Sequence, residues 1–307
     1  TNNGIVDGRI YVQGTASVVA DTVNMGLVAG DTNMVRSRIY IADSGELRAT
    51  TIQAGDTSGA NDDQTVRQIN FTSGTIGNKT GTDLTVTSDI DVVFDGAGVH
   101  NFDIDAGQIG TIDASISEIS GPAGLVKAGG GTLRLNADNT FSGAITVDAG
   151  TLGGAGSVPG DVSVADGAGL SPGASISTFG IGGTLTLDGE TTHDVELSSE
   201  TIHDLITSDV LDLSGATIVN IDLTVLDPSH HTDTDGIELF TYNTLVGDVS
   251  AITWNVTTLG EYWRWQGTPT VGEGTGSIVL NGVDFIPEPT SLALLALGAL
   301  GLLRRRR

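Results

Sequence analysis

The sequence predicts an all-β protein folded as a right-handed parallel β-helix, or β-solenoid. Composition, an internal repeat and a strand–turn rhythm lead to this prediction. The 307 residues include 44 Gly and no Cys, and Asp outnumbers Glu by 29 to 9. Asp, Gly, Asn, Ser and Thr favour turns over helix interiors, whereas short runs of Val, Ile and Leu suit strands. We therefore expect many short strands joined by turns.

The N-terminal part contains a gap-free repeat. The segment RIYVQGTASVVADTVNMG, from Arg9, aligns with RIYIADSGELRATTIQAG, from Arg38, and a degraded copy, RQINFTSGTIG, begins at Arg67. A unit of two strands and a turn cannot bury its apolar face alone, so the copies must stack. We expect residues 1–190 to form the solenoid. A β-sandwich would also explain alternating strands, but it would not explain a gap-free repeat.

The segment 124–158 resembles a known repeat. It contains GLVK from Gly124, GTL from Gly131, NTFSG from Asn139 and AGTL from Ala149, in this order. These pieces resemble the autotransporter-associated β-strand repeat. The resemblance implies a passenger-type β-helix that is exported and displayed at the surface, and it implies no enzyme activity.

Residues 191–285 have a different texture. They form a series of alternating strand patterns with fewer glycines, and they contain Trp254, Trp263 and Trp265, the three Trp of the chain. A solenoid needs an end that does not expose its core. We therefore expect a β-rich C-terminal or capping module here.

Residues 286–307 end the chain with an apolar run and a basic cluster. The 13 residues from Ser291 to Leu303 carry no charge and include seven Leu. As a helix, this run would be about 20 Å long at ~1.5 Å per residue, shorter than the hydrocarbon core of about 30 Å. The stop-transfer cluster that follows consists of Arg304, Arg305, Arg306 and Arg307. Positive charges stay cytoplasmic, so we expect a short hydrophobic helix that is a transient inner-membrane anchor, with residues 1–286 outside.

Pro287, Glu288 and Pro289 precede the apolar run. The two prolines disfavour helix and ladder pairing, which predicts an extended tripeptide suited to a processing enzyme. The order Pro-Glu-Pro, apolar helix and Arg cluster resembles the PEP-CTERM sorting signal of Gram-negative bacteria. This resemblance implies recognition by an exosortase, a membrane-embedded cysteine protease. The enzyme would cleave near the motif and pass the protein to the cell surface or an exopolysaccharide matrix.

The charge of the chain excludes one class of partner. The formal net charge is −25, and such a surface repels the phosphates of nucleic acids, so we expect no nucleic-acid binding. The lack of Cys excludes disulfides, thiolate metal sites and Cys nucleophiles. The first residues, TNNG, contain neither Met nor an apolar leader. We expect either that a signal peptide has been removed or that this is a fragment.

Two His-Asp pairs, His193-Asp194 and His203-Asp204, stand ten residues apart in strand-like sequence. Because side chains alternate along a strand, the two members of each pair point to opposite faces. We expect surface polar residues here rather than a catalytic or metal site.

The segment HTDTDG places Asp233 and Asp235 before Gly236, which hints at a calcium loop. His231 and Tyr242 stand where such a loop needs acidic ligands, so a plain turn is the better prediction. We expect no catalytic residue and no cofactor, with Ca²⁺ left open as a bound cation.

The sequence thus favours a structural or adhesive protein over an enzyme. Glycan lyases and glycosidases need carboxylates, or a base with Lys or Arg, that converge in one groove, and no such pair stands out by its spacing. The predicted function is an exported surface or matrix protein whose partners are the exosortase, the inner membrane and surface glycans such as exopolysaccharide. A surface-attached β-helix enzyme that degrades polysaccharide is the alternative.

Overall fold

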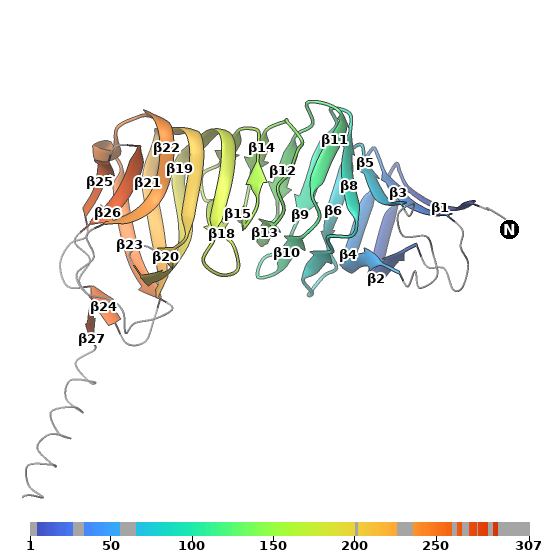
Figure 1. Ribbon diagram of the computed structural model, residues 1–307, viewed down its shortest axis with the longest axis horizontal. Coiled ribbons are helices and arrows are strands. Elements are labelled where there is room, and N and C mark those ends of the chain that lie inside the picture. Colours follow the sequence, from blue (N-terminus) through green and yellow to red (C-terminus); the bar gives the residue numbers. More distant parts are fainter. Residues whose placement is uncertain are drawn as a thin grey trace, which may run out of the picture.

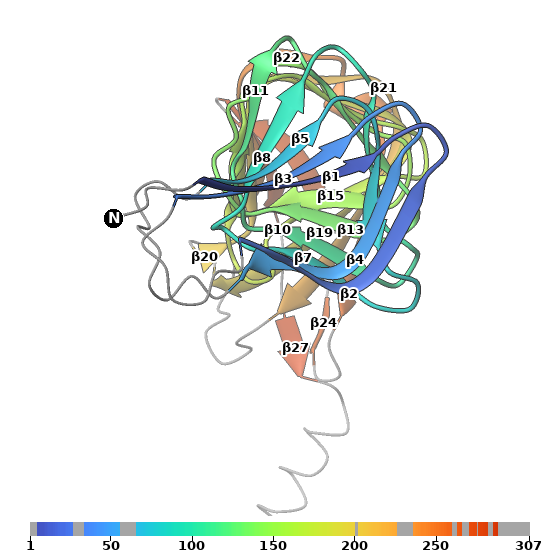
Figure 2. The same cartoon turned by 90° about the vertical axis from the view of Figure 1, so that its right-hand side faces the viewer.

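The computed structural model describes residues 5–26, 34–55, 66–199, 202–225, 236–259, 263–265, 270–274, 276–281 and 285–287. These residues are all-β apart from one short 3-10 helix, η3 (Val249–Ala251). The strands wind into an elongated solenoid whose coils follow one another along the long axis (Figure 1). Seen along that axis, successive coils lie over one another (Figure 2). The predicted all-β solenoid is confirmed.

One face of the first coils is a five-stranded parallel sheet. Its strands are β1 (Ile5–Val12), β3 (Met34–Ile41), β5 (Val66–Phe71), β8 (Asp91–Asp95) and β11 (Ile116–Ser120). In this sheet each strand pairs with the strand one coil further along the chain. This arrangement satisfies the backbone groups of one coil with those of the next.

The remaining strands of the solenoid belong to a second, continuous sheet that wraps around the other faces. They are β2 (Ser17–Met25), β4 (Glu46–Ala54), β6 (Gly74–Asn78), β7 (Leu84–Val86), β9 (His100–Asp103), β10 (Ile109–Ile112), β12 (Leu125–Ala128), β13 (Thr132–Leu135), β14 (Ile145–Val147), β15 (Thr151–Gly154), β16 (Ser157–Val158), β17 (Val162–Val164), β18 (Gly169–Pro172), β19 (Thr178–Ser199), β20 (Ile202–His203), β21 (Leu205–Val225), β22 (Ile237–Val246), β23 (Thr253–Leu259), β25 (Thr270–Gly274) and β26 (Ser277–Asn281). The long strand β19 pairs in turn with β16, β17 and β18, so one strand spans what three strands form in the preceding coil.

The gap-free repeat corresponds to one coil of the solenoid. Tyr11 in β1 pairs with Tyr40 in β3, and their rings stack with centroids 4.9 Å apart. The third copy is the next coil, but its register differs by one residue from the sequence alignment, because Arg67 pairs with Ser37 rather than with Arg38. The stacking of copies that the repeat predicts is therefore confirmed.

The core consists of columns of inward-pointing side chains that run along the solenoid axis. In the five-stranded sheet, Val12, Ile41, Phe71 and Phe94 are paired in succession, and each is 0% exposed. Three further columns follow the second sheet. Their members, in order, are Leu47, Ile76, Phe102, Lys127, Val147, Val164 and Leu187 in the first; Leu84, Gly110, Leu133, Leu152, Leu170, His193 and Ile221 in the second; and Gly74, His100, Leu125, Ile145, Val162, Leu185 and Leu211 in the third.

The C-terminal end of the solenoid is closed by antiparallel strands. β22 pairs with β21 in parallel and with β26 in antiparallel orientation, and β25 pairs with β26. Ile278 and Leu280 of β26 are fully buried, so this hairpin covers the apolar end of the coil before it. The division of the chain at residue 190 stays a prediction, and strand β19 runs through that position.

A separate two-stranded sheet lies beside this end. It pairs β24 (Trp263–Trp265) with β27 (Phe285–Pro287) in antiparallel orientation. Nowhere in the described ranges is there a helix long and apolar enough to cross a bilayer. The apolar run 291–303, and with it the predicted C-terminal helix, lies outside the described residues.

Candidate functional site

The predicted sorting motif begins where the described chain ends. Pro287 is the last residue of β27, and it is paired with Trp263 of β24. The prediction that the motif's prolines avoid ladder pairing is therefore wrong for Pro287. A proline is tolerated at the end of an edge strand, where its missing N–H leaves no gap inside the ladder. Glu288, Pro289 and the cluster formed by Arg304, Arg305, Arg306 and Arg307 lie outside the described residues.

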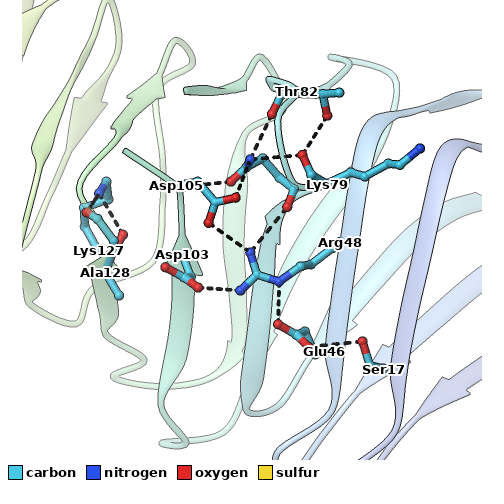
Figure 3. Close-up of polar contacts among 11 residues, drawn as sticks. Ser17, Glu46, Arg48, Lys79, Thr82, Asp103, Asp105, Lys127 and Ala128 are labelled. Carbon is cyan, nitrogen blue, oxygen red and sulfur yellow. Dashed lines mark hydrogen bonds and ion pairs between the residues drawn. The ribbon is translucent and has the colours of Figure 1, made fainter. Parts of the chain in front are cut away.

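The largest ionic cluster links three coils through Arg48 on β4 (Figure 3). Its guanidinium is 2.5 Å from the Glu46 carboxylate and 2.5 Å from the Asp103 carboxylate, and it lies 3.8 Å from that of Asp105. Ser17 on the preceding coil donates a hydrogen bond to Glu46 at 3.1 Å. One arginine thus neutralises carboxylates that would otherwise repel each other across neighbouring coils.

Lys127 occupies a position in the core. It stands between Phe102 and Val147 in its column, and it is 0% exposed. Lys is almost never fully buried unless its charge is paired or hydrogen-bonded. The position therefore requires an account of where the ammonium group goes.

The Lys127 ammonium turns to the corner of the coil, where it uses its three donors on backbone carbonyls. The acceptors are the oxygens of Ala128 at 2.8 Å, Gly129 at 2.8 Å and Ala149 at 3.1 Å. Burial lowers the pKa of Lys127 to about 8, and attraction to Asp103 opposes this shift. Because this pKa lies above 7, the ammonium stays charged at neutral pH and ties one coil corner to the next.

His193 is buried in the core. It stands between Leu170 and Ile221 in its column and is 1% exposed, so the prediction of a surface position is wrong. Its Nε2 lies 3.2 Å from the Thr191 hydroxyl oxygen, and its ring packs edge-on against Phe240. Burial lowers the pKa of His193 to about 3. A neutral, fully enclosed imidazole of this kind acts as a packing element and has no access to a substrate.

His100 has a comparable place one column away. It is 0% exposed, and its ring stacks on Phe94 with centroids 4.1 Å apart. Its Nδ1 lies 2.8 Å from the carbonyl oxygen of Gly124 on the next coil. Burial lowers the pKa of His100, and the contact with that carbonyl opposes the shift. The neutral ring therefore fills the core and also satisfies a backbone group.

Asp204 is the second residue of a His-Asp pair that the structure buries. It is 2% exposed and accepts hydrogen bonds from the backbone N–H groups of Ser177 at 2.7 Å and Glu196 at 2.8 Å. Burial raises the pKa of Asp204 to about 6, although the two amides act in the opposite direction. The surface prediction is wrong here as well, and the carboxylate serves to hold three chain segments together.

Several other aspartates bind backbone amides of a neighbouring coil. The pairs are Asp43 with Gly14, Asp83 with Ile109, Asp161 with Thr184 and Asp166 with Glu190, at 2.7 to 3.2 Å. Buried asparagines act similarly: Asn78 accepts from the Asp105 amide, and Asn139 accepts from the Ile116 amide. These side chains satisfy corner amides that the strand ladders leave free.

One shallow groove crosses several coils on the side of the solenoid. Its volume is about 300 Å³, and its lining consists of Asn139, Ser157, Val158, Pro159, Gly180, Ile181, Gly182 and Thr207. None of these residues is acidic, basic or a histidine, so the groove offers no general acid or base. Within the described ranges, no three His, Asp or Glu side chains are grouped to hold a metal ion. Asp233 and His231 lie outside those ranges, and the calcium question at that loop stays a prediction.

The sequence contained a usable signal for the buried polar groups. His193 has the same parity along its strand as Val195 and Leu197, which are both buried, whereas Asp194 is on the exposed face. Lys127 likewise shares its parity with Leu125. Strand parity therefore identifies such residues as inward-pointing even where their polarity suggests the surface.

Comparison with protein families identifies two segments of the chain. Residues 125–153 match the passenger-associated-transport-repeat, which covers β12 to β15 and includes the buried Lys127. Residues 285–307 match the PEP-CTERM protein-sorting motif, which begins with strand β27. No curated protein matches the chain as a whole. The chain thus carries a passenger-type repeat and the signal that exosortases recognise, which marks export to the envelope or surface of Gram-negative bacteria.

Proposed function

We propose that this protein is a non-enzymatic structural or adhesive component of the bacterial cell surface or extracellular matrix, delivered there by an exosortase. The observation that carries the proposal is the combination of a sorting motif with a solenoid whose polar groups hold the coils together. A sorting signal determines where a protein goes, and the body determines what it does after arrival.

The body has the properties of a stiff acidic rod. Every coil pairs with its neighbours through backbone hydrogen bonds, which resists bending and sliding between coils. The charged side chains with assigned contacts serve mainly to join coils, as Arg48, Asp161 and Asp166 do. With a net charge of −25, such a rod stays soluble and attracts cations rather than anionic polymers directly. Contact with an acidic exopolysaccharide would therefore run through bridging divalent cations, whereas neutral glycans would bind without them.

The sorting step is tested by mass spectrometry of the protein isolated from a host that has an exosortase. We expect a mature C-terminus near Pro287, Glu288 and Pro289, and replacing Glu288 by Ala should leave the precursor intact. An intact Arg307 on the secreted wild-type protein would overturn the sorting proposal.

The structural role is tested separately on the purified secreted protein. A panel of neutral and acidic polysaccharides should bind or fail to bind without being shortened, as followed by the release of reducing ends and unsaturated sugars. Reproducible turnover would replace the structural proposal with the alternative, a surface-attached polysaccharide lyase or glycosidase.

A further inference from the structure

The strand that leads into the sorting motif is paired with another part of the chain. In the antiparallel sheet of β24 and β27, Trp265 is opposite Phe285, Arg264 is opposite Ile286, and Trp263 is opposite Pro287. The pairing ends at Pro287, the first residue of the motif. Because proline has no N–H, the ladder lacks a donor at this position. The fold thus fixes the segment up to the motif and no further.

This pairing competes with the way in which proteases bind their substrates. Enzymes that recognise extended peptides commonly add the substrate as a strand to an exposed edge and use its backbone N–H and C=O groups. In β27 the edge that faces β24 is already occupied. An enzyme that needs this edge has to wait until β27 separates from β24.

The two-stranded sheet is suited to repeated opening. It contains three residue pairs, and an isolated pair of short strands is only marginally stable in water. The main ladders of the solenoid, by contrast, run over many strands, and β19 alone pairs with β21 along most of its length. The β24–β27 pair can therefore open while the solenoid stays folded.

We propose that strand β24 is a latch that controls access to the sorting site. The latch holds β27 against the C-terminal end of the folded solenoid, and an exosortase processes the chain only in the open form. The step makes and breaks backbone hydrogen bonds alone. This proposal rests on the proposed exosortase sorting, because it concerns the regulation of that same site.

A reversible lock on the latch provides the test. The chain has no Cys, so the double substitution Arg264→Cys and Ile286→Cys introduces a single pair of thiols. Residues directly opposite each other in an antiparallel sheet have Cα atoms about 4.5–5.5 Å apart, which suits a disulfide. A disulfide that closes a loop of this size lowers the open population by roughly 100-fold. In an exosortase-containing host with an oxidising periplasm, the precursor of this variant should accumulate, and added reductant should restore processing.

Matched controls separate the latch from other effects. Glu238→Cys with Val279→Cys locks another antiparallel pair, between β22 and β26, away from the motif. This variant and the two single Cys variants should be processed like the wild type. Processing is measured as the fraction of chains with the mature C-terminus.

The outcomes distinguish the two proposals. If the wild type itself is never processed, the sorting proposal fails. If the wild type is processed and the locked β24–β27 variant is processed at the same rate, with its disulfide verified, the latch proposal fails while sorting stands. Accumulation of precursor in the β24–β27 lock alone, reversed by reductant, supports the latch.

Discussion

Replacing Lys127 by Met tests whether the solenoid core depends on the ammonium group buried in it. Met has a similar length and fills the same column between Phe102 and Val147, so the substitution leaves little cavity. It does leave three backbone carbonyls at the coil corner without their donor. The perturbation is therefore one of hydrogen bonding rather than of volume.

The expected loss of unfolding free energy follows from two opposing contributions. Three hydrogen bonds from a charged donor contribute about 6 kcal/mol together. Burying the ammonium costs about 3 kcal/mol, the value that corresponds to a pKa lowered from 10.5 to about 8. Removing both contributions leaves a net destabilisation of about 3 kcal/mol. Urea unfolding followed by circular dichroism should show a clearly lower midpoint for Lys127→Met.

Lys79 provides the matched control because it is the only other lysine in the chain. Its side chain is 35% exposed and forms an ion pair with Asp21, which is 80% exposed. Such surface pairs contribute at most about 1 kcal/mol, so Lys79→Met should shift the midpoint little. Equal shifts for the two variants would refute the reasoning that the three carbonyls depend on the Lys127 ammonium.

The pH dependence of stability gives an independent check on the same residue. The pKa of Lys127 is lowered in the folded state, so the unfolded chain binds more protons between pH 8 and 10.5. Stability of the wild type relative to Lys127→Met should therefore rise with pH across this window, by up to about 3 kcal/mol. A flat difference between the two proteins would show that the ammonium is not buried in a charge-disfavouring site.

Three further predictions concern the buried acid and base and the tight coil contacts. For His193, whose pKa is lowered to about 3, protons bind the unfolded chain first, so unfolding free energy should fall by about 1.4 kcal/mol per pH unit below 6.5; His193→Leu should remove this slope in acid unfolding curves. For Asp204, the raised pKa of about 6 gives the opposite sign, with stability lost as pH rises from 3.8 to 6; Asp204→Asn should therefore abolish a gain of about 3 kcal/mol on acidification. Gly154→Ala should lower the melting temperature far more than Gly167→Ala, because both glycines have positive φ but a Cβ at Gly154 would lie 2.1 Å from the Leu135 oxygen, while none of the atoms tested lies within 4 Å at Gly167; equal effects would assign the cost to backbone conformation alone.

The sequence predicts the architecture well where the repeat is regular. The copies from Arg9 and Arg38 align without a gap, and the structure pairs them residue by residue. At Arg67 the coil is present but the register moves by one residue. A shifted register preserves the pattern of stacked coils while changing which residues meet, so composition and spacing alone do not determine it.

The polar groups of the core were harder to predict than the coils. A histidine or lysine in strand-like sequence is more often exposed than buried, and this expectation failed for His193 while alternation along the strand was correct. The reason is physical: burial depends on the face of the strand, and a polar group can follow if a partner is within reach. For Lys127 the partners are carbonyls at a turn between coils, which only the folded corner brings together.

The same reasoning connects the charge of the chain to its proposed processing. Arg304, Arg305, Arg306 and Arg307 supply four of the 13 basic residues, and all four follow the sorting motif. Removal of this segment leaves a body that is still more acidic, while Arg48 and Lys127 stay because their charges hold coils together. Cleavage would therefore turn a membrane-held precursor into a self-repelling rod, which favours separate, soluble molecules over association with one another. The cations that remain stabilise the fold, and the cations that leave serve delivery.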